Sequence, residues 1–456
     1  AEEGAGEAPY ILPLATDLDT AIPAIRDIRP QFVRVGEKRQ AEGEPETVVL
    51  LEDPEGLVGQ PVALSTFAFA LAGLFNGRRT AREVVAAFEQ KFEQSVDPMQ
   101  VLELQRELDR ALLLYSSRFE RAVKRQIQSF LTRETRSAAH AGSAYPADPL
   151  ALHETINSFF IAPEGPGALP ASKETASISK NTLPPIAAPQ SNTVKALILP
   201  HIDLRVGGPT YAHGYARLLR ESQADLFFVL GVAHQATSNG GLYMVSQKDY
   251  ETPLGLVKTE KSIANRLQLA AGTEPAMAEL AHRTEHSIEF QAVLLASLLQ
   301  RQKRDFEIVP ILCGSVDSFL GIGANPLEGG AFREFAQALR NEIDICNRRW
   351  CVICSVDFSH VGPEFDHSTS MTERLMPAVE RYDRRLLTHA ANLDVPAFFK
   401  EIDRTQNSRH VDAVVAVLTM LKACEGLIST GKLLHYDQLF KEGTHSAVSY
   451  ASLSFE

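Results

Sequence analysis

The sequence LFFVLGVAH, Leu226 to His234, is a run of buried-strand residues that ends in a histidine. Two other runs have the same form: ALILPH, Ala196 to His201, and WCVICSVDFSH, Trp350 to His360. Buried parallel strands are continuous Val, Ile, Leu and Phe runs, and open α/β sheets bind ligands outside the carboxyl ends of such strands. These runs predict an α/β fold with a mostly parallel central sheet flanked by helices. They also predict that the three histidines converge on one metal or proton-transfer centre.

Composition limits the possible functions. The chain has 456 residues, which allows two or three domains, and a net charge of -12 without long basic runs. This argues against nucleic-acid and anionic-membrane partners. No apolar run approaches the roughly 20 residues that span a bilayer. The acidic N-terminal tail lacks the apolar core of a signal peptide, and five cysteines are an odd, sparse count. We therefore expect a cytoplasmic protein with reduced thiols.

Cys351 and Cys354 form a CxxC pattern inside the third apolar run. Residues three apart in a strand point to opposite faces of the sheet, so the two thiols are poorly placed to share one metal. We interpret them as packed core residues.

Residues 1–125 have the pattern of a small separate module. A strand is predicted at Val48–Leu51, followed by a turn at residues 53–56 and a buried helix over Leu64–Phe75. Thr80 with Glu83 forms a capping box for a helix to about Glu93, and Asp97, Pro98 and Gln100 open another helix. LLLY, residues 112–115, then predicts a short strand. This order of elements is typical of a winged-helix α+β domain.

The module resembles PqqD-like peptide-recognition domains through the turn FNGRRT, Phe75 to Thr80, and the closing segment RALLLYSSRF, Arg110 to Phe119. A helical domain that only packs on its neighbour is the alternative. DNA binding is disfavoured because Arg78, Arg79 and Arg82 form only a thin basic patch. A charged helical connector is expected at residues 126–136. Within the following domain, 137–456, the Pro-rich stretch 162–192 reads as a flexible insertion.

Seven motifs of the large domain resemble the Memo family, in the family's order: HAGSAYPAD (140–148), LPHIDLRVGGPTYAHGY (199–215), VLGVAH (229–234), YETPLG (250–255), EHSIEFQ (285–291), SVDFSH (355–360) and SAVSYA (446–451). The resemblance implies a fold related to class III extradiol dioxygenases, which are non-haem iron enzymes that open catechol rings.

The resemblance also implies a metal, iron or copper, held by two histidines and a cysteine. The two histidines fall on His201 and His234, and a further pocket histidine falls on His360, three residues after Asp357. The family cysteine falls on Asn407. A neutral carboxamide binds transition metals weakly, so loss of the metal is one expectation.

Asp203 stands where the family has glycine, and its carboxylate could complete a two-histidine, one-carboxylate iron site. The alternative is that Asp203 turns to solvent. Iron is the expected cofactor, with copper or zinc as alternatives, and a metal-free protein stays open. With a metal present, His360 is the expected general base and acid, and Asp357 orients it or caps the following turn.

His282, Glu285 and His286 spell HxxEH, the pattern of inverzincin zinc peptidases. The resemblance suggests instead that a helix begins near Glu285, which leaves His282 outside it and disfavours the peptidase. His286 and Glu289 then read as substrate-pocket residues together with Asn407, or as a structural capping pair.

Two classes of function follow from these observations. The first is a metal-dependent oxidoreductase of the extradiol type that acts on a small aromatic or on a peptide. The second is a noncatalytic binding or scaffold protein that has lost the metal. The resemblance further implies a system with radical-SAM and AMMECR-type partner proteins, in which this chain corresponds to AmmeMemoRadiSam system protein B.

Overall fold

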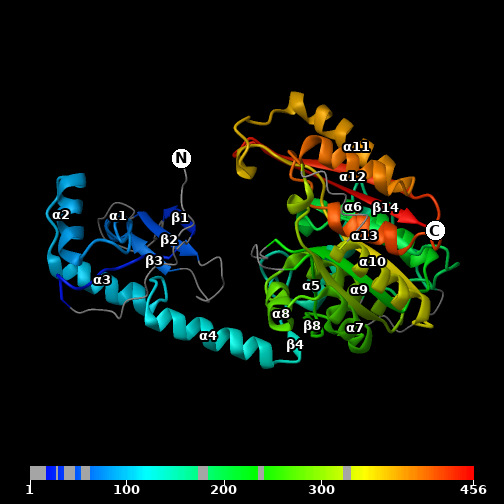
Figure 1. The fold of residues 1–456 in the computed structure, drawn as a ribbon, viewed down its shortest axis with the longest axis horizontal. Helices are drawn as coiled ribbons and strands as arrows, with labels where there is room; N and C mark the ends of the chain where they lie inside the picture. Colours follow the sequence, from blue (N-terminus) through cyan, green and yellow to red (C-terminus); the bar gives the residue numbers. More distant parts are fainter. Residues whose placement is uncertain are drawn as a thin grey trace. The chain divides into compact units, whose positions relative to one another are not determined.

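The computed structural model describes residues 17–26, 29–34, 47–52, 62–172, 183–234, 241–321 and 330–456. The chain divides into two compact units, Ala1–Thr132 and Arg133–Glu456, which are described separately (Figure 1).

The N-terminal unit combines a three-stranded antiparallel sheet with helices. The sheet has the order β1 (Arg29–Arg34), β2 (Thr47–Glu52), β3 (Val62–Ser65). The helices that follow are α1 (Thr66–Ala72), α2 (Ala81–Phe92), α3 (Pro98–Arg110) and α4 (Ser117–Thr132). One apolar cluster joins the buried residues of β2, β3 and α1 to α3.

The predicted helix starts of this unit are confirmed. The hydroxyl of Thr80 accepts the N–H of Glu83, whose side chain accepts the N–H of Thr80 in return, and Asp97 makes the same exchange with Gln100. Helix α1 is shorter than predicted, since Ser65 caps it and it ends at Ala72. The strand predicted at residues 112–115 is wrong among the described residues, because Leu114 forms only an isolated bridge. The predicted turn at 53–56 lies outside the described residues, and the winged-helix interpretation stays a prediction.

The C-terminal unit is built on a large mixed sheet. Its centre is five parallel strands in the order β5 (Ala196–Leu199), β11 (Trp350–Ser355), β6 (Leu226–Val232), β10 (Glu307–Cys313), β9 (Gly255–Thr259). The remaining strands extend the two sides and are β4 (Thr135–Arg136), β7 (Tyr243–Val245), β8 (Asp249–Thr252), β12 (His360–Val361), β13 (Lys432–Lys441) and β14 (Ser446–Phe455). The predicted α/β class with a mostly parallel centre is therefore confirmed.

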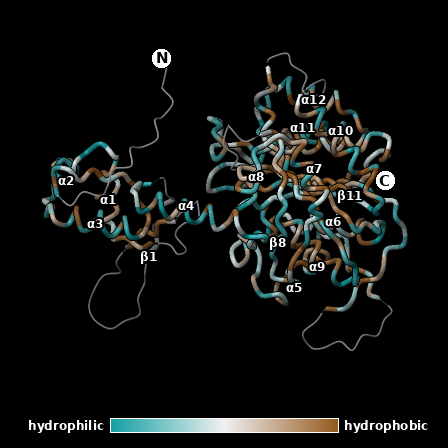
Figure 2. Tube along the Cα trace, turned by 60° about the horizontal axis from the view of Figure 1, so that its bottom comes forward, coloured by the Kyte–Doolittle hydropathy of each residue, from teal (hydrophilic) through white to brown (hydrophobic). Residues whose placement is uncertain are grey.

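Helices cover both faces of this sheet. One face packs on α5 (Pro149–Ile161), α6 (Leu204–Glu221) and α9 (His286–Arg301), with α8 (Pro275–His282) at the margin. The other face packs on α7 (Lys261–Ala271), α10 (Gly330–Ile345), α11 (Met376–Ala391), α12 (Val395–Thr405) and α13 (Val414–Ala423). In Figure 2 the hydrophobic segments run through the interior between these helices.

Alternation along the strands confirms the interpretation of the CxxC pattern. Cys351 packs into the cluster of α5, α6 and α9, whereas Cys354 packs into the cluster of α10 and α13. Both thiols are fully buried on opposite faces of β11, and burial raises the pKa of each. They therefore cannot clasp one ion.

The predicted insertion 162–192 is described only at its ends, because residues 173–182 lie outside the described part. Ile186 is buried in the core, and its N–H donates to the carbonyl of Arg301. The described end of this segment is thus packed against α9. None of the helices in the described ranges has both the length and the apolar character needed to cross a membrane.

Candidate metal centre

Three histidines meet at the edge of the sheet where the parallel strands end. His201 follows β5, His234 follows β6, and His286 is the first residue of α9. Ring centroids lie 4.8 Å apart for His201 and His234, 5.2 Å for His201 and His286, and 4.8 Å for His234 and His286. One nitrogen from each ring lies within 4.8 Å of the others, so these side chains could hold a metal ion.

Asp412 brings a carboxylate into the same centre. Its Oδ2 lies 3.1 Å from Nε2 of His201 and 3.9 Å from Nε2 of both His234 and His360. This oxygen is sealed from solvent and has no hydrogen-bond partner of good geometry among the described residues. A buried carboxylate is costly without a positive partner, and either the protonated imidazoles or a metal cation among them would offset that cost. The donor set of nitrogens and one oxygen therefore fits a divalent transition metal.

The outer nitrogens of the rings are already held in place. Nδ1 of His201 lies 3.0 Å from the carbonyl oxygen of Ser355, and Nδ1 of His234 lies 3.0 Å from Oε1 of Glu285. A carbonyl and an ionised carboxylate can only accept, so each Nδ1 carries the hydrogen. Each Nε2 is then left to face the centre, which is the arrangement of metal-binding histidines.

Glu285 fixes the start of α9 as well as His234. It caps the helix by accepting the N–H groups of His286 and Ser287, and its Oε2 accepts the N–H of His234. Although burial acts in the opposite direction, His234 and His286 hold the pKa of Glu285 well below its usual range. The sequence pattern around Glu285 predicts the start of a helix but not this contact with His234.

Opposite charges dominate the electrostatics of the centre without a metal. Burial lowers the pKa of His201, but the carboxylates of Asp412 and Asp357 outweigh it and raise that pKa to about 9. Burial likewise opposes the protonation of His234, but Asp412 and Glu285 raise its pKa to about 10. Burial alone would raise the pKa of Asp412, whereas His201 and His234 hold it well below its usual range.

The predicted catalytic residues Asp357 and His360 make different contacts. Asp357 is buried, its Oδ1 accepts the N–H of His201, and its own N–H donates to Asp412 Oδ1. Asp357 thus holds His201 and Asp412 in register. His360 lies at the start of β12 with its Nδ1 3.1 Å from the carbonyl oxygens of Phe358 and His410.

Asp203, predicted as a metal ligand, caps α6 instead of joining the histidine group. Its Oδ1 accepts the N–H of Arg205, and both carboxylate oxygens also contact the Arg205 guanidinium, at 2.9 and 2.5 Å. The metal-capable group of histidines in the described chain is His201, His234 and His286, and it contains neither Asp203 nor Asp412.

Glu289, predicted in the substrate pocket, lies in a buried ion pair. Arg136 Nη1 donates to its Oε2 at 2.6 Å, and both side chains are 0% exposed. The N–H of His140 and the hydroxyl of Tyr145 donate to its Oε1. The guanidinium of Arg136 also donates to the carbonyls of His282 and Glu285. These contacts tie the start of this unit to α9.

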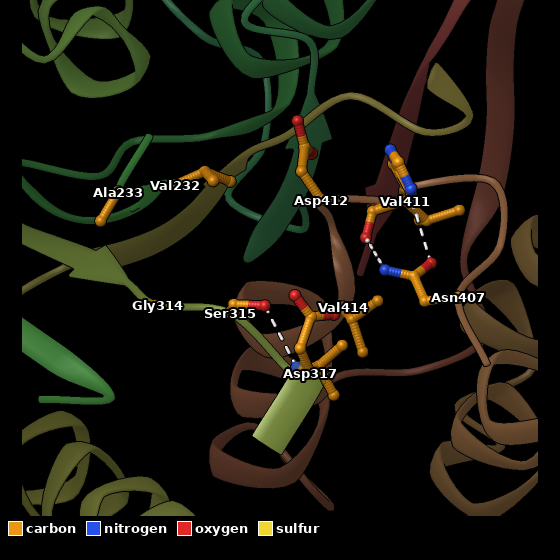
Figure 3. Close-up of a pocket in the computed structure, with 11 residues that line it drawn as sticks. Val232, Ala233, Gly314, Ser315, Asp317, Asn407, Val411, Asp412 and Val414 are labelled. Atoms are coloured by element: carbon orange, nitrogen blue, oxygen red, sulfur yellow. Dashed lines mark hydrogen bonds between the residues drawn. The ribbon is translucent and has the colours of Figure 1, made fainter. Parts of the chain in front are cut away.

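Asn407, predicted at the substrate site, closes a loop. Its Nδ2 donates to the carbonyl of Val411 at 3.1 Å, and its Oδ1 accepts the N–H of Val411 at 2.9 Å. Asn407 has a φ of 45°, in the left-handed region that asparagine tolerates well. Figure 3 shows this clamp, with the Asp412 carboxylate directed away from it.

A cavity of about 260 Å³ adjoins Asp412 (Figure 3). It lies between the end of β6, the segment after β10 and the loop that leads into α13. Its walls combine small apolar residues with nearly as many polar ones and are formed by Val232, Ala233, Gly314, Ser315, Val316, Asp317, Asn407, His410, Val411, Asp412 and Val414.

Asp412 is the functional candidate that sequence reasoning missed. A lone carboxylate just before the apolar helix α13 reads as an ordinary helix-start residue. The signal in the sequence is an acidic residue five positions after Asn407 that stands just before a mostly apolar helix.

The prediction that HxxEH does not form a zinc-binding helix is confirmed. His282 ends α8 and His286 begins α9 after the cap Glu285. His282 is buried, and its two nitrogens lie 2.8 Å from the hydroxyl of Tyr250 and 2.9 Å from the carbonyl of Met244. It has no nitrogen left for a metal.

Comparison with known families assigns this unit. The family model described as Memo-like protein matches residues 136–454. The chain belongs to the Memo-like protein family. Membership agrees with the resemblance found in the motifs and covers the whole of the histidine and Asp412 centre.

Relatives of the Memo-like chain occur in bacteria, archaea and animals. A MEMO1 family protein of Aquifex aeolicus is 27% identical over 409 residues, which cover 89% of this chain and 95% of the relative. A MEMO1 family protein of Pyrococcus furiosus is 28% identical over 58% of this chain and 87% of its own length. The memo-1 homolog of Caenorhabditis elegans is 27% identical over 70% and 81%. The Aquifex alignment is longer than the C-terminal unit, so it extends into the N-terminal unit.

Proposed function

We propose that this protein is a metal-dependent oxidoreductase of the extradiol dioxygenase type. One observation carries the proposal: ligand nitrogens of His201, His234 and His286 lie within 4.8 Å of one another, and the buried Oδ2 of Asp412 lies 3.1 Å from His201 Nε2. Iron is the metal best suited to two histidines and a carboxylate with open positions.

A bound iron supplies a Lewis acid that can hold two neighbouring substrate oxygens and dioxygen together. Ring opening of a catechol inserts both oxygen atoms and breaks one carbon–carbon bond, so it needs no further reductant. His201 and His234 are presented for such a metal through Nε2, because their Nδ1 hydrogens are donated elsewhere.

In this proposal His360 moves the proton of a substrate hydroxyl. Its Nδ1 faces two carbonyl oxygens and therefore carries a hydrogen. Its Nε2 lies 3.9 Å from Asp412 Oδ2 and is available as a general base, then acid. Side-chain exposure of 16% keeps this nitrogen largely away from bulk water.

The cavity beside Asp412 favours a small substrate. A volume of about 260 Å³ accommodates a single aromatic ring with short substituents. Val232, Val411 and Val414 can contact the ring, and Ser315 or Asp317 can bind a polar substituent. A peptide side chain of the same size is an alternative substrate, delivered by the N-terminal unit.

Metal analysis followed by oxygen uptake tests the proposal. Protein purified without chelator, or reconstituted with ferrous iron, should hold one iron and consume oxygen with a panel of catechols. The double variant His201→Ala/His234→Ala should hold none. A wild-type protein that takes up no ferrous iron would remove the proposal.

A noncatalytic binding protein is the second candidate, and the charges of the centre favour it. His201 and His234, with pKa values of about 9 and 10, can neutralise Asp412 and Glu285 without a metal. In that case the pocket would bind a ligand but take up no iron. In either case we propose partners of the radical-SAM and AMMECR types, which pull-down from a native host can test.

A further inference from the structure

We infer that Asp412 is the third protein ligand of the metal, and that its carboxylate makes the centre select ferrous iron over cuprous copper. The inference rests on the proposed function and deepens it, because it states which carboxylate completes the metal site and which metal that carboxylate selects. The family cysteine position cannot supply it, because both amide atoms of Asn407 are bonded to Val411.

Distances favour Asp412. Ligand atoms bound at about 2.1 Å from one ion lie roughly 3.0 to 3.4 Å apart in octahedral or tetrahedral geometry. Asp412 Oδ2 is already 3.1 Å from His201 Nε2, and it is 3.9 Å from His234 Nε2. A shift of less than about 1 Å in His234 would complete the geometry.

The support around Asp412 fixes its second oxygen. Oδ1 accepts the N–H of Asp357, whose carboxylate in turn accepts the N–H of His201. The Asn407 clamp on Val411 fixes the residue just before Asp412. Only Oδ2 is left without a hydrogen-bond partner in the described structure, and it faces the imidazoles.

The other carboxylate that the sequence offered has a different partner, because Asp203 is paired with Arg205. His286 belongs to the metal-capable group, and its side chain is 31% exposed, close to the 35% of His234, so it can serve as a further ligand beside Asp412. Asp412 differs from both in that its Oδ2 is sealed from solvent and lies 3.1 Å from His201 Nε2.

Charge and ligand type set the metal preference. Three buried carboxylates, Asp412, Glu285 and Asp357, surround the imidazoles, so a divalent cation balances more of their charge than a monovalent one. Carboxylate is a hard ligand, and cuprous copper is selected by soft sulfur ligands. The described centre offers oxygen and nitrogen, since the buried Cys351 and Cys354 belong to the sheet core.

Metal titration of stripped protein tests the inference. Wild type should bind one ferrous ion, and Asp412→Asn should weaken this binding at least about 10- to 100-fold. Asp317→Asn, in the same cavity, and Asp203→Asn are the matched controls and should bind like wild type. Cuprous copper should not displace iron from wild type at equal concentration.

Cobalt spectroscopy gives a readout independent of affinity and activity. Cobalt(II) bound to Asp412→Cys should show a sulfur-to-cobalt charge-transfer band, whereas Asp317→Cys with cobalt should lack it. An Asp412→Asn protein that binds ferrous iron as tightly as wild type, or a cobalt-loaded Asp412→Cys protein without the band, would overturn the inference alone. A wild type that binds neither metal would overturn the proposed function as well.

Discussion

The Oδ2 atom of Asp412 lies 3.1 Å from the Nε2 atom of His201, although 211 positions separate the two residues in the chain. His201 follows strand β5 of the sheet. Asp412 precedes α13, a helix that packs on one face of that sheet. Their contact lies at the centre that we propose to hold a metal.

Metal binding should release protons and strengthen with pH. The pKa values of His201 and His234, about 9 and 10, lie above neutrality, so the metal-free protein carries protons that a metal must displace. The affinity for ferrous iron or cobalt should rise by up to about tenfold per pH unit, for each proton displaced, between pH 7 and about 9. Calorimetry in buffers of different ionisation enthalpy measures the release. A pH-independent affinity would contradict this.

Replacing Glu285 should weaken the centre without removing a ligand. Glu285 accepts from Nδ1 of His234 at 3.0 Å and caps α9. Glu285→Gln should lower metal affinity about 10- to 100-fold, because His234 loses its orienting partner. It should also cost about 1 kcal/mol of stability through the weakened cap. Glu274→Gln, at the cap of the neighbouring α8, is the control and should leave metal affinity unchanged.

Breaking the buried pair of Arg136 and Glu289 should destabilise the C-terminal unit. Both side chains are fully buried, so Glu289→Gln leaves an unpaired guanidinium and should cost about 3–5 kcal/mol. Arg136→Met/Glu289→Gln should cost less than the sum of the single changes. Urea unfolding followed by the fluorescence of Trp350, the single tryptophan, measures this unit selectively. Full additivity would show that the two groups are not coupled.

His282 should make the C-terminal unit less stable in mild acid. Burial lowers the pKa of this histidine to about 4, from about 6.5 in an unfolded chain. The unfolded state therefore binds the extra proton first. The contribution of neutral His282 to the free energy of unfolding is fully present above about pH 6.5. It is lost as the pH falls towards 4, by up to about 3 kcal/mol. The stability difference between wild type and His282→Gln, followed by Trp350 fluorescence, should shrink over this range. A constant difference would refute the assignment.

The hydrogen bonds between Asn407 and Val411 should affect metal affinity only by positioning Asp412. Asn407→Ala removes both hydrogen bonds to Val411 and should cost about 1–2 kcal/mol. Because Val411 precedes Asp412, metal affinity should also fall, although Asn407 is not a ligand in our proposal. Asn407→Ser, which can restore one of the bonds, should fall between wild type and alanine. Unchanged affinity in the alanine variant would show that the clamp does not position Asp412.

Local sequence patterns determined the elements that position the centre. Apolar runs predicted the parallel strands because strands buried on both faces require apolar residues throughout, and His201 and His234 follow from where those runs end. The capping boxes at Thr80 and Asp97 could be predicted, since a cap depends on residues three positions apart. The separation of Cys351 from Cys354 followed from the two-residue period of a strand.

Only the tertiary structure decided which distant groups meet. The sequence offered Asp203 as the carboxylate of the centre, but local bonds to Arg205 hold it at the start of α6. Asp412 reaches His201 because α13 packs on the sheet that contains β5. No local sequence pattern encodes that packing. Charge balance in a buried site depends on such long-range contacts, so the ligand set could not be predicted from spacing. By itself the sequence determined the fold class and the histidine edge, whereas the packing of α13 against the sheet placed the carboxylate.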